Sequence, residues 1–146
     1  MHILAGDYFR FPTEVGGFVL MQYLGVHPLM GDCVTCCKSI DGIEFSIRTS
    51  HVFFYPMELN IRKKNIEYCQ RGSPCMAVPA AIRRPFVLDK KVVYWFVDDN
   101  KGTRRVEQLS KEELGLPIGT AVSHAVLKEI YEGVRWFLFE EVNISA

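Results

Sequence analysis

The alternation of apolar and polar positions predicts a chain made mostly of β-strands. Near the N-terminus, two apolar-rich runs, "YFRFP" at residues 8–12 and "GFVLMQYLGV" at residues 17–26, flank a turn that contains Gly16 and Gly17. Glycine tolerates the backbone angles of tight turns, so the two runs are expected to form a β-hairpin. Both faces of the second run carry apolar side chains, which is typical of a strand in the middle of a sheet.

Further strand signals follow at short intervals. Ile43, Phe45 and Ile47 alternate with polar residues, and short β-like runs occupy residues 33–38 and 52–55. Residues 92–97 and 103–109 predict a second hairpin around the turn "DDNKG". Residues 57–72 fit either an edge strand with its neighbour or a short helical turn. Three prolines predict an extended, irregular connection over residues 72–85.

One long helix is predicted, over Thr120–Glu132, where apolar residues recur at spacings of three and four and Gly133 is placed as the C-terminal cap. Ser110 and Glu113 match a capping box that begins a short helical turn. The run "VRWFLFEEV" at residues 134–142 predicts a last strand. The expected fold is therefore α+β and mostly β: a twisted antiparallel sheet or partly open barrel, with one main helix at about residues 120–132 packed on it.

Length and charge narrow the class of protein. The 146 residues predict a single domain spanning residues 1–146. Lys plus Arg and Asp plus Glu both number 17, so there is no basic excess of the kind that nucleic-acid-binding proteins usually carry. The sequence shows neither a secretory signal nor a run long enough to span a membrane. Five cysteines cannot form an even disulfide framework, so a reduced, cytoplasmic setting is predicted.

The cysteines are the strongest candidates for a metal site. Cys33 and Cys36, with the adjacent Cys37, would supply half of a tetrahedral zinc site, and Cys69 and Cys75 the other half. The second pair is spaced more widely than usual, and the first pair falls inside a predicted strand. No helix pattern follows Cys36, which argues against a thioredoxin-type redox motif. The favoured interpretation is that the cysteines pack as small hydrophobic residues, and no cofactor is predicted.

Other catalytic signals are weak. The histidines form no metal-binding pair, no nucleophile elbow is present, and the Gly16–Gly17 turn lacks the residues of a phosphate-binding loop. The aromatic residues, 12% of the chain, are assigned to core packing rather than to base stacking. Paired acids remain, and we interpret four of them as a surface displayed toward a basic partner: Asp98, Asp99, Glu112 and Glu113.

The layout resembles a known family. "GDYFRFP", then a glycine-containing turn and "GFVLMQYLG", is similar to the start of bacterial immunity protein 26, and the later "YWFVDDNKGTRRVEQLSKEELGLP" and "SHAVLKEIYEG" keep a similar order. The cysteine cluster at residues 33–37 departs from the family. The resemblance implies a cytoplasmic protein that binds and neutralises a cognate toxin of a polymorphic toxin system, without catalysis. Gly6, Asp7 and Pro12 match the opening motif and are interpreted as structural.

The sequence therefore predicts a non-enzymatic immunity protein whose partner is a toxin, with a nuclease effector as one option, and without a nucleic-acid or membrane partner. Two alternatives stay open. One is a small zinc protein or enzyme that uses Cys33, Cys36, Cys69 and Cys75, and the other is a nucleic-acid-binding β-barrel.

Overall fold

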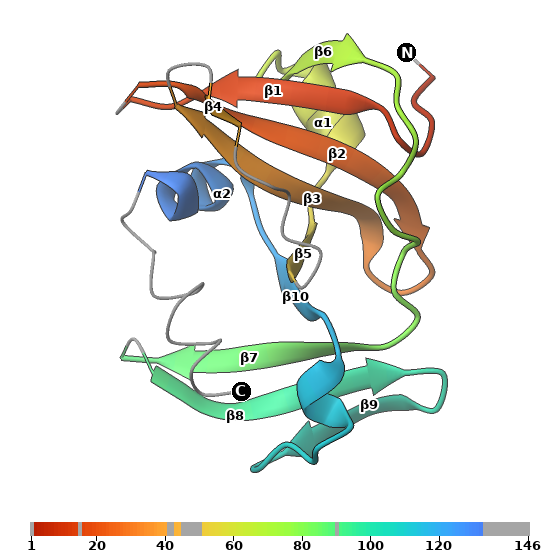
Figure 1. Cartoon of the computed structure of the whole chain (residues 1–146). Coiled ribbons are helices and arrows are strands. Elements are labelled where there is room, and N and C mark those ends of the chain that lie inside the picture. Colours follow the sequence, from red (N-terminus) through yellow and green to blue (C-terminus); the bar gives the residue numbers. More distant parts are fainter. Residues whose placement is uncertain (1, 15, 41–42, 45–50, 90, 133–146) are drawn as a thin grey trace.

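The computed structural model describes residues 2–14, 16–40, 43–44, 51–89 and 91–132, and these form one sheet with two α-helices and a short 3-10 helix (Figure 1). The strands in chain order are β1 Tyr8–Pro12, β2 Phe18–His27, β3 Gly31–Ile40, β4 Ile43–Glu44, β5 His51–Phe54, β6 Glu67–Gln70, β7 Ile82–Leu88, β8 Lys91–Asp99, β9 Gly102–Val106 and β10 Ile118–Ala121. The helices are α1 Met57–Arg62, η1 Glu113–Gly115 and α2 His124–Tyr131. None of the described helices is long and apolar enough to span a membrane.

The strand order is β6-β1-β2-β3-β5-β10-β7-β8-β9, with β4 paired to β3 beside this path. Strands β6, β1, β2 and β3 lie at one end of the molecule and β7, β8 and β9 at the other, joined through β5 and β10 (Figure 1). All pairings are antiparallel except those of β10, which runs parallel to β5 and β7. The predicted mostly β fold, an open twisted sheet with one main helix, is confirmed.

The predicted N-terminal hairpin is confirmed. Strands β1 and β2 pair from Tyr8 opposite Gln22 to Pro12 opposite Phe18. Gly16 and Gly17 both have positive φ angles, of 99° and 73°, in the turn between the strands. Glycine adopts this conformation without steric cost, which explains the Gly-Gly pair.

Gly6 and Asp7, which belong to the opening motif "GDYFRFP", have a structural role. The Asp7 side chain is 1% exposed, and its carboxylate accepts hydrogen bonds from the Leu4 amide at 2.9 Å and from Arg71 Nε at 3.3 Å. The wholly buried Gln22 donates through Nε2 to the carbonyl oxygens of Gly6 (3.1 Å) and Ser73 (2.7 Å). Because these contacts satisfy buried polar groups, they hold the first turn and the segment after β6 against the sheet.

The main helix is shorter than predicted. Residues 118–121 form β10, and α2 begins only at His124, because the Ser123 hydroxyl caps the helix by accepting from the Val126 amide at 3.2 Å. The apolar periodicity after Ser123 is helical as predicted, and Leu127 and Ile130 are buried in the core. Gly133 and the predicted strand at residues 134–142 lie outside the described residues.

Two other assignments are refined. The ambiguous stretch 57–72 contains both α1 and the edge strand β6. Strand β7 begins at Ile82, so Pro85 lies within a strand rather than in the predicted irregular connection. Among the described residues, the ladder between β7 and β10 includes only the pair Arg83–Ile118, so Pro85 has no described strand partner on that side, where a proline without an N–H is tolerated.

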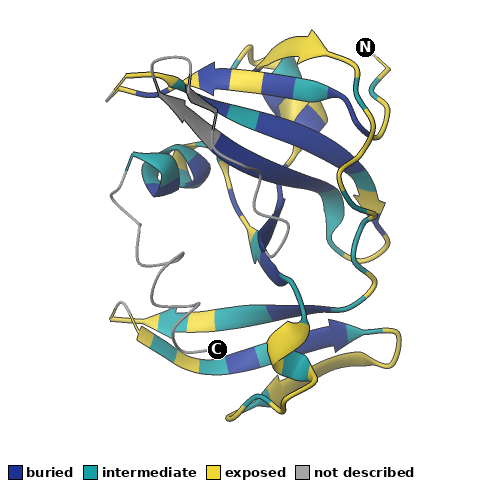
Figure 2. Cartoon of the chain, viewed as in Figure 1, coloured by how far each residue is buried: buried dark blue, intermediate teal, exposed yellow. Residues whose placement is uncertain are grey.

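The core lies along the middle of the sheet. Phe11, Val19, Met21, Phe53 and other apolar side chains from β1, β2, β3 and β5 pack with α2 in the largest buried cluster. Burial follows this pattern in Figure 2, where β2, β3 and β5 are mostly buried while β6 and β9 are mostly exposed.

A half-buried histidine makes the stability of the fold depend on pH. His124 Nδ1 lies 2.9 Å from the Tyr55 hydroxyl, and burial, with a smaller contribution from Lys128, lowers the pKa of His124 below its usual range. The unfolded chain therefore binds a proton more readily than the native chain does. The free energy of unfolding is expected to fall as the pH drops below about 6.5.

Urea unfolding at pH 7.5 and pH 5.5 measures this effect. The variant His124→Asn keeps a hydrogen-bond acceptor for Tyr55 but does not titrate, so its loss of stability between the two pH values is expected to be smaller than that of the native sequence. The same loss in both proteins would show that His124 does not contribute to the pH dependence.

Candidate protein-interaction site

A row of arginine and aromatic side chains covers one face of the β7–β8–β9 end of the sheet. In β8, Tyr94 and Phe96 lie on the face opposite Trp95, because side chains alternate along a strand. The strand register places Phe86 of β7 opposite Tyr94, and Arg84 of β7 and Arg105 of β9 on either side of Phe96. We call these five residues the arginine–aromatic face: Arg84, Phe86, Tyr94, Phe96 and Arg105.

The rings and guanidinium groups of this face contact one another. The rings of Phe86 and Tyr94 stack with centroids 4.5 Å apart, and Tyr94 meets Phe96 edge to face at 5.4 Å. The Arg105 guanidinium lies 3.9 Å from the Tyr94 ring centroid, and that of Arg84 lies 5.1 Å from the Phe96 centroid. These contacts fix the side chains in place before any partner arrives, so binding would cost less conformational entropy.

The face is partly exposed and continues into apolar surface. Phe86 is 39% exposed, whereas Tyr94 and Phe96 are half-buried. At the neighbouring end of the β7–β8 hairpin, Leu88 is 58% and Val93 48% exposed. Exposed apolar and aromatic side chains next to arginines are typical of protein interfaces.

The arginines of the face are neutralised by acids. Arg84 forms a bidentate ion pair with the Asp98 carboxylate, which also accepts a hydrogen bond from the Thr103 hydroxyl. Arg105 pairs with Glu107 through Nη2 at 2.7 Å. Burial of Asp98 raises its pKa, but the hydrogen bonds from Arg84 and Thr103 outweigh it and hold the pKa of this carboxyl below its usual range. The face is therefore close to neutral, so phosphate backbones have little electrostatic reason to bind there.

The four acids predicted to face a partner do not form an open acidic surface. Asp98 is only 4% exposed, so its prediction as a displayed acid is corrected: it anchors Arg84 inside the sheet. Asp99 and Glu113 are brought together by Arg104, which donates to Asp99 at 2.7 Å and to Glu113 at 3.1 Å. Of these four acids, only Glu112 is exposed and forms no ion pair with a described residue.

The predicted capping box explains the position of Glu113. The Glu113 amide donates to the Ser110 hydroxyl at 3.2 Å, and the Ser110 amide donates to the Glu113 carboxylate at 2.8 Å. This reciprocal pair is confirmed, and it assigns Glu113 a structural role at the start of η1.

The cysteines do not meet in one place. Cys33 and Cys36 lie in β3 as predicted, but they are buried in separate apolar clusters, while Cys69 and Cys75 are exposed. No group of three or more potential metal ligands was found in the part of the chain that the structure describes. Burial raises the pKa of Cys33 to about 12, and burial together with the neighbouring Cys37 raises that of Cys36. Cys33 and Cys36 thus pack as neutral thiols.

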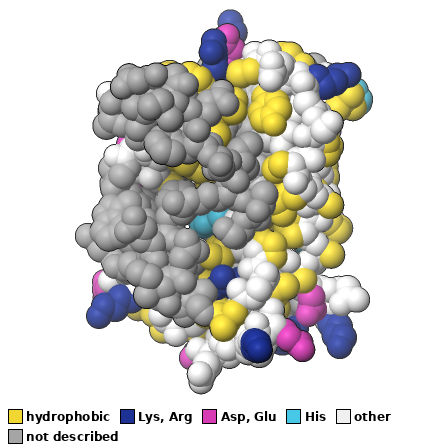
Figure 3. Space-filling model, viewed as in Figure 1, with side chains coloured by type: hydrophobic (Ala, Val, Ile, Leu, Met, Phe, Trp, Pro, Cys, Tyr) yellow, Lys and Arg dark blue, Asp and Glu magenta, His cyan; other side chains and the backbone are white. Residues whose placement is uncertain are grey.

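A second apolar surface lies where β2 turns into β3. Val26 and Leu29 are 63% and 71% exposed, and they border a pocket of about 520 Å³ that the segment at residues 78–80 and the β8–β9 turn complete. Hydrophobic side chains gather along this side of the molecule, at the right of Figure 3, and most of the Lys and Arg side chains in that view lie toward its upper and lower edges. The described Lys and Arg side chains visible in this view thus form no continuous patch.

Sequence analysis missed the arginine–aromatic face because it assigned the aromatic residues to the core. That assignment holds for Phe53, Phe54, Tyr55 and Trp95, which are buried. Phe86 and Tyr94 differ because neighbouring strands pair edge to edge and do not cover each other's faces. One face of the β7–β8 pair is therefore partly exposed to solvent. The sequence did contain a signal: Arg84 and Phe86 are two residues apart, and so are Tyr94 and Phe96. Each pair therefore lies on one face of its strand, and the two strands pair with each other.

Comparisons of the chain with models of protein families, with curated proteins and with solved structures gave no match. The resemblance to bacterial immunity protein 26 therefore stays a prediction from the sequence, and the class of protein is argued from the fold and its surfaces.

Proposed function

We propose that this chain is an immunity protein that binds a cognate toxin and neutralises it by occupying its surface, without catalysing a reaction. The observation that carries the proposal is the arginine–aromatic face, where Phe86, Tyr94 and Arg105 combine exposed area with fixed geometry. Tyr and Arg are enriched among the residues that dominate binding energy in protein interfaces. The sequence resemblance supplies the toxin as the partner.

The pairing of the two arginines and the positions of the cysteines favour this proposal over its alternatives. A nucleic-acid-binding sheet would combine exposed rings with unpaired cations, whereas Arg84 and Arg105 are each paired with a carboxylate. The zinc alternative needs four thiols in one tetrahedral array, and Cys33 and Cys36 lie in different clusters. A face that is arginine-rich, aromatic and nearly neutral fits a protein surface better than it fits a polyanion.

The immunity function predicts a stoichiometric complex with the toxin encoded beside this chain. Size-exclusion chromatography of the purified pair should give one complex with equal amounts of both proteins. Toxin activity, titrated with this chain, should fall linearly and reach zero at one equivalent. Absence of a complex would contradict the proposal, and full neutralisation at a small fraction of one equivalent would indicate an enzyme instead.

A further inference from the structure

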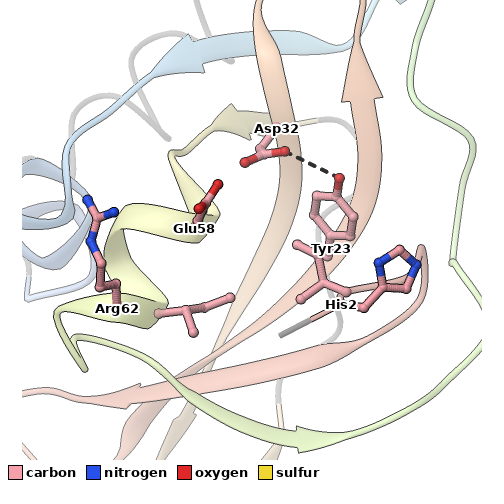
Figure 4. Close-up of a pocket in the computed structure, with 7 residues that line it drawn as sticks. His2, Tyr23, Asp32, Glu58 and Arg62 are labelled. Carbon is pink, nitrogen blue, oxygen red and sulfur yellow. Dashed lines mark hydrogen bonds between the residues drawn. The ribbon is translucent and has the colours of Figure 1, made fainter.

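A separate pocket opens between the N-terminal segment, the paired strands β2 and β3, and helix α1. Its volume is about 490 Å³, within the range that binds small ligands or single side chains. Figure 4 shows the polar groups that surround it. The lining residues are His2, Ile3, Tyr23, Asp32, Glu58, Ile61 and Arg62.

The Asp32 carboxylate is fixed in the wall of this pocket. One carboxylate oxygen accepts from the Tyr23 hydroxyl at 3.3 Å, and the other accepts from the Met57 amide at 3.1 Å. The Asp32 carbonyl also accepts from the Tyr55 amide at 3.0 Å, which holds the backbone. A carboxylate held in this way needs no reorganisation to receive a cation.

The two carboxylates of this pocket form no ion pair with a described residue, although Arg62 also lines the pocket. Within the described part of the chain, neither Asp32 nor Glu58 forms an ion pair, although most other acidic side chains do. Figure 4 shows the Glu58 carboxylate directed toward Asp32 and the Arg62 guanidinium directed away from it. The two carboxylates thus leave room for a cation from outside the chain.

Apart from Asp32, Glu58, Arg62 and His2, the lining is apolar or aromatic. Ile3 and Ile61 supply aliphatic surface, and Tyr23 supplies a ring. Burial, followed by the charge of Asp32, raises the pKa of Tyr23 to about 12, so its hydroxyl stays protonated and continues to donate. A long aliphatic side chain that ends in a cation matches the two carboxylates, the aliphatic surface and the Tyr23 ring of this lining: its stem meets apolar surface, and its charged end meets carboxylates and a ring.

We propose that this pocket receives a lysine or arginine side chain of the bound partner. The identity of that partner as a toxin rests on the proposed function, but the chemistry of the pocket does not. A basic side chain of the toxin would bind the pocket between Asp32 and Glu58 and complement the neutral contact of the arginine–aromatic face. The pocket is a second candidate for an acidic contact, besides the four acids predicted from the sequence at residues 98–99 and 112–113.

The test uses small probes and the full chain, without the toxin. Acetyl-arginine amide is titrated into the ¹⁵N-labelled protein, and the amide signals of Tyr23 and Met57 are followed by NMR. These signals are expected to shift with saturation, whereas acetyl-citrulline amide, which has the same shape without the charge, should leave them nearly unchanged. The variant Glu58→Gln should weaken the binding of the arginine probe by about threefold or more, since it removes one partly exposed charge contact.

Two further variants keep the test decisive. Asp32→Asn should weaken the binding of the probe more strongly than Glu58→Gln does. Because this variant also disturbs the contact with Met57, its fold is checked by the dispersion of its NMR spectrum. Glu112→Gln, an exposed acid without an ion pair among the described side chains, should leave binding unchanged. Equal shifts with the citrulline probe, or undiminished binding in Glu58→Gln, would overturn the proposal. Because no toxin is present, this outcome leaves the immunity function untouched.

Discussion

Replacement of Tyr94 by alanine is expected to weaken toxin binding by about thirtyfold to a hundredfold, which corresponds to about 2–3 kcal/mol for a residue at the centre of an interface. Tyr94 contacts Phe86, Phe96 and Arg105, so its removal takes away the ring that positions all three. Isothermal titration calorimetry with the purified toxin measures the change. Arg105→Ala should also weaken binding, since the Arg105 side chain is 57% exposed.

Tyr68→Ala is the matched control, because Tyr68 is a 41% exposed tyrosine on β6, at the other edge of the sheet. It should bind the toxin as the native sequence does. Thermal unfolding of each variant separates a lost contact from a lost fold. Native affinity in both folded variants, Tyr94→Ala and Arg105→Ala, would remove the arginine–aromatic face from the interface.

The second large effect concerns the fold. Gly6→Ala is expected to lower the free energy of unfolding by at least about 3 kcal/mol, because two costs add at one position. Gly6 has a φ angle of 102°, which residues with a side chain rarely adopt, and a Cβ there would overlap the carbonyl oxygen of Gly72. The hydrogen bond from the Gly6 amide to the Tyr23 carbonyl, 2.7 Å long, leaves little freedom to relax.

Urea unfolding followed by circular dichroism measures this loss, and Gly115→Ala provides the comparison. A Cβ at Gly115 meets no atom within 4 Å, and its φ angle is not in the left-handed region, so that variant should stay within about 0.5 kcal/mol of the native sequence. Similar stabilities for Gly6→Ala and Gly115→Ala would contradict the close packing between the first turn and residue 72.

Local signals in the sequence predicted much of the fold. Short runs of apolar, β-branched and aromatic residues identified β2, β5 and β8, and the two reciprocal hydrogen bonds of the Ser110–Glu113 capping box were predicted from the sequence. These features depend on residues that are near one another along the chain. The parallel strand β10 was missed because its four residues are strand only through pairing with β5, which lies far away in sequence.

The candidate site was harder to predict, because exposure depends on which face of each strand the rest of the chain covers. Phe86 and Phe53 are the same residue type in similar apolar runs, yet one is 39% and the other 1% exposed. The acids show the same difficulty. Asp98 and Asp99 looked equivalent in the sequence, but Asp98 is buried against Arg84 and Thr103, whereas Asp99 lies near the surface with Arg104.

Hydrogen–deuterium exchange of this chain, free and bound to the toxin, tests most directly that the arginine–aromatic face forms the contact. The account predicts that the complex slows exchange at residues 84–88 and 92–106, while exchange in β6 stays as it is in the free protein. Protection confined to β6 and β1, with unchanged exchange along β7, β8 and β9, would contradict it.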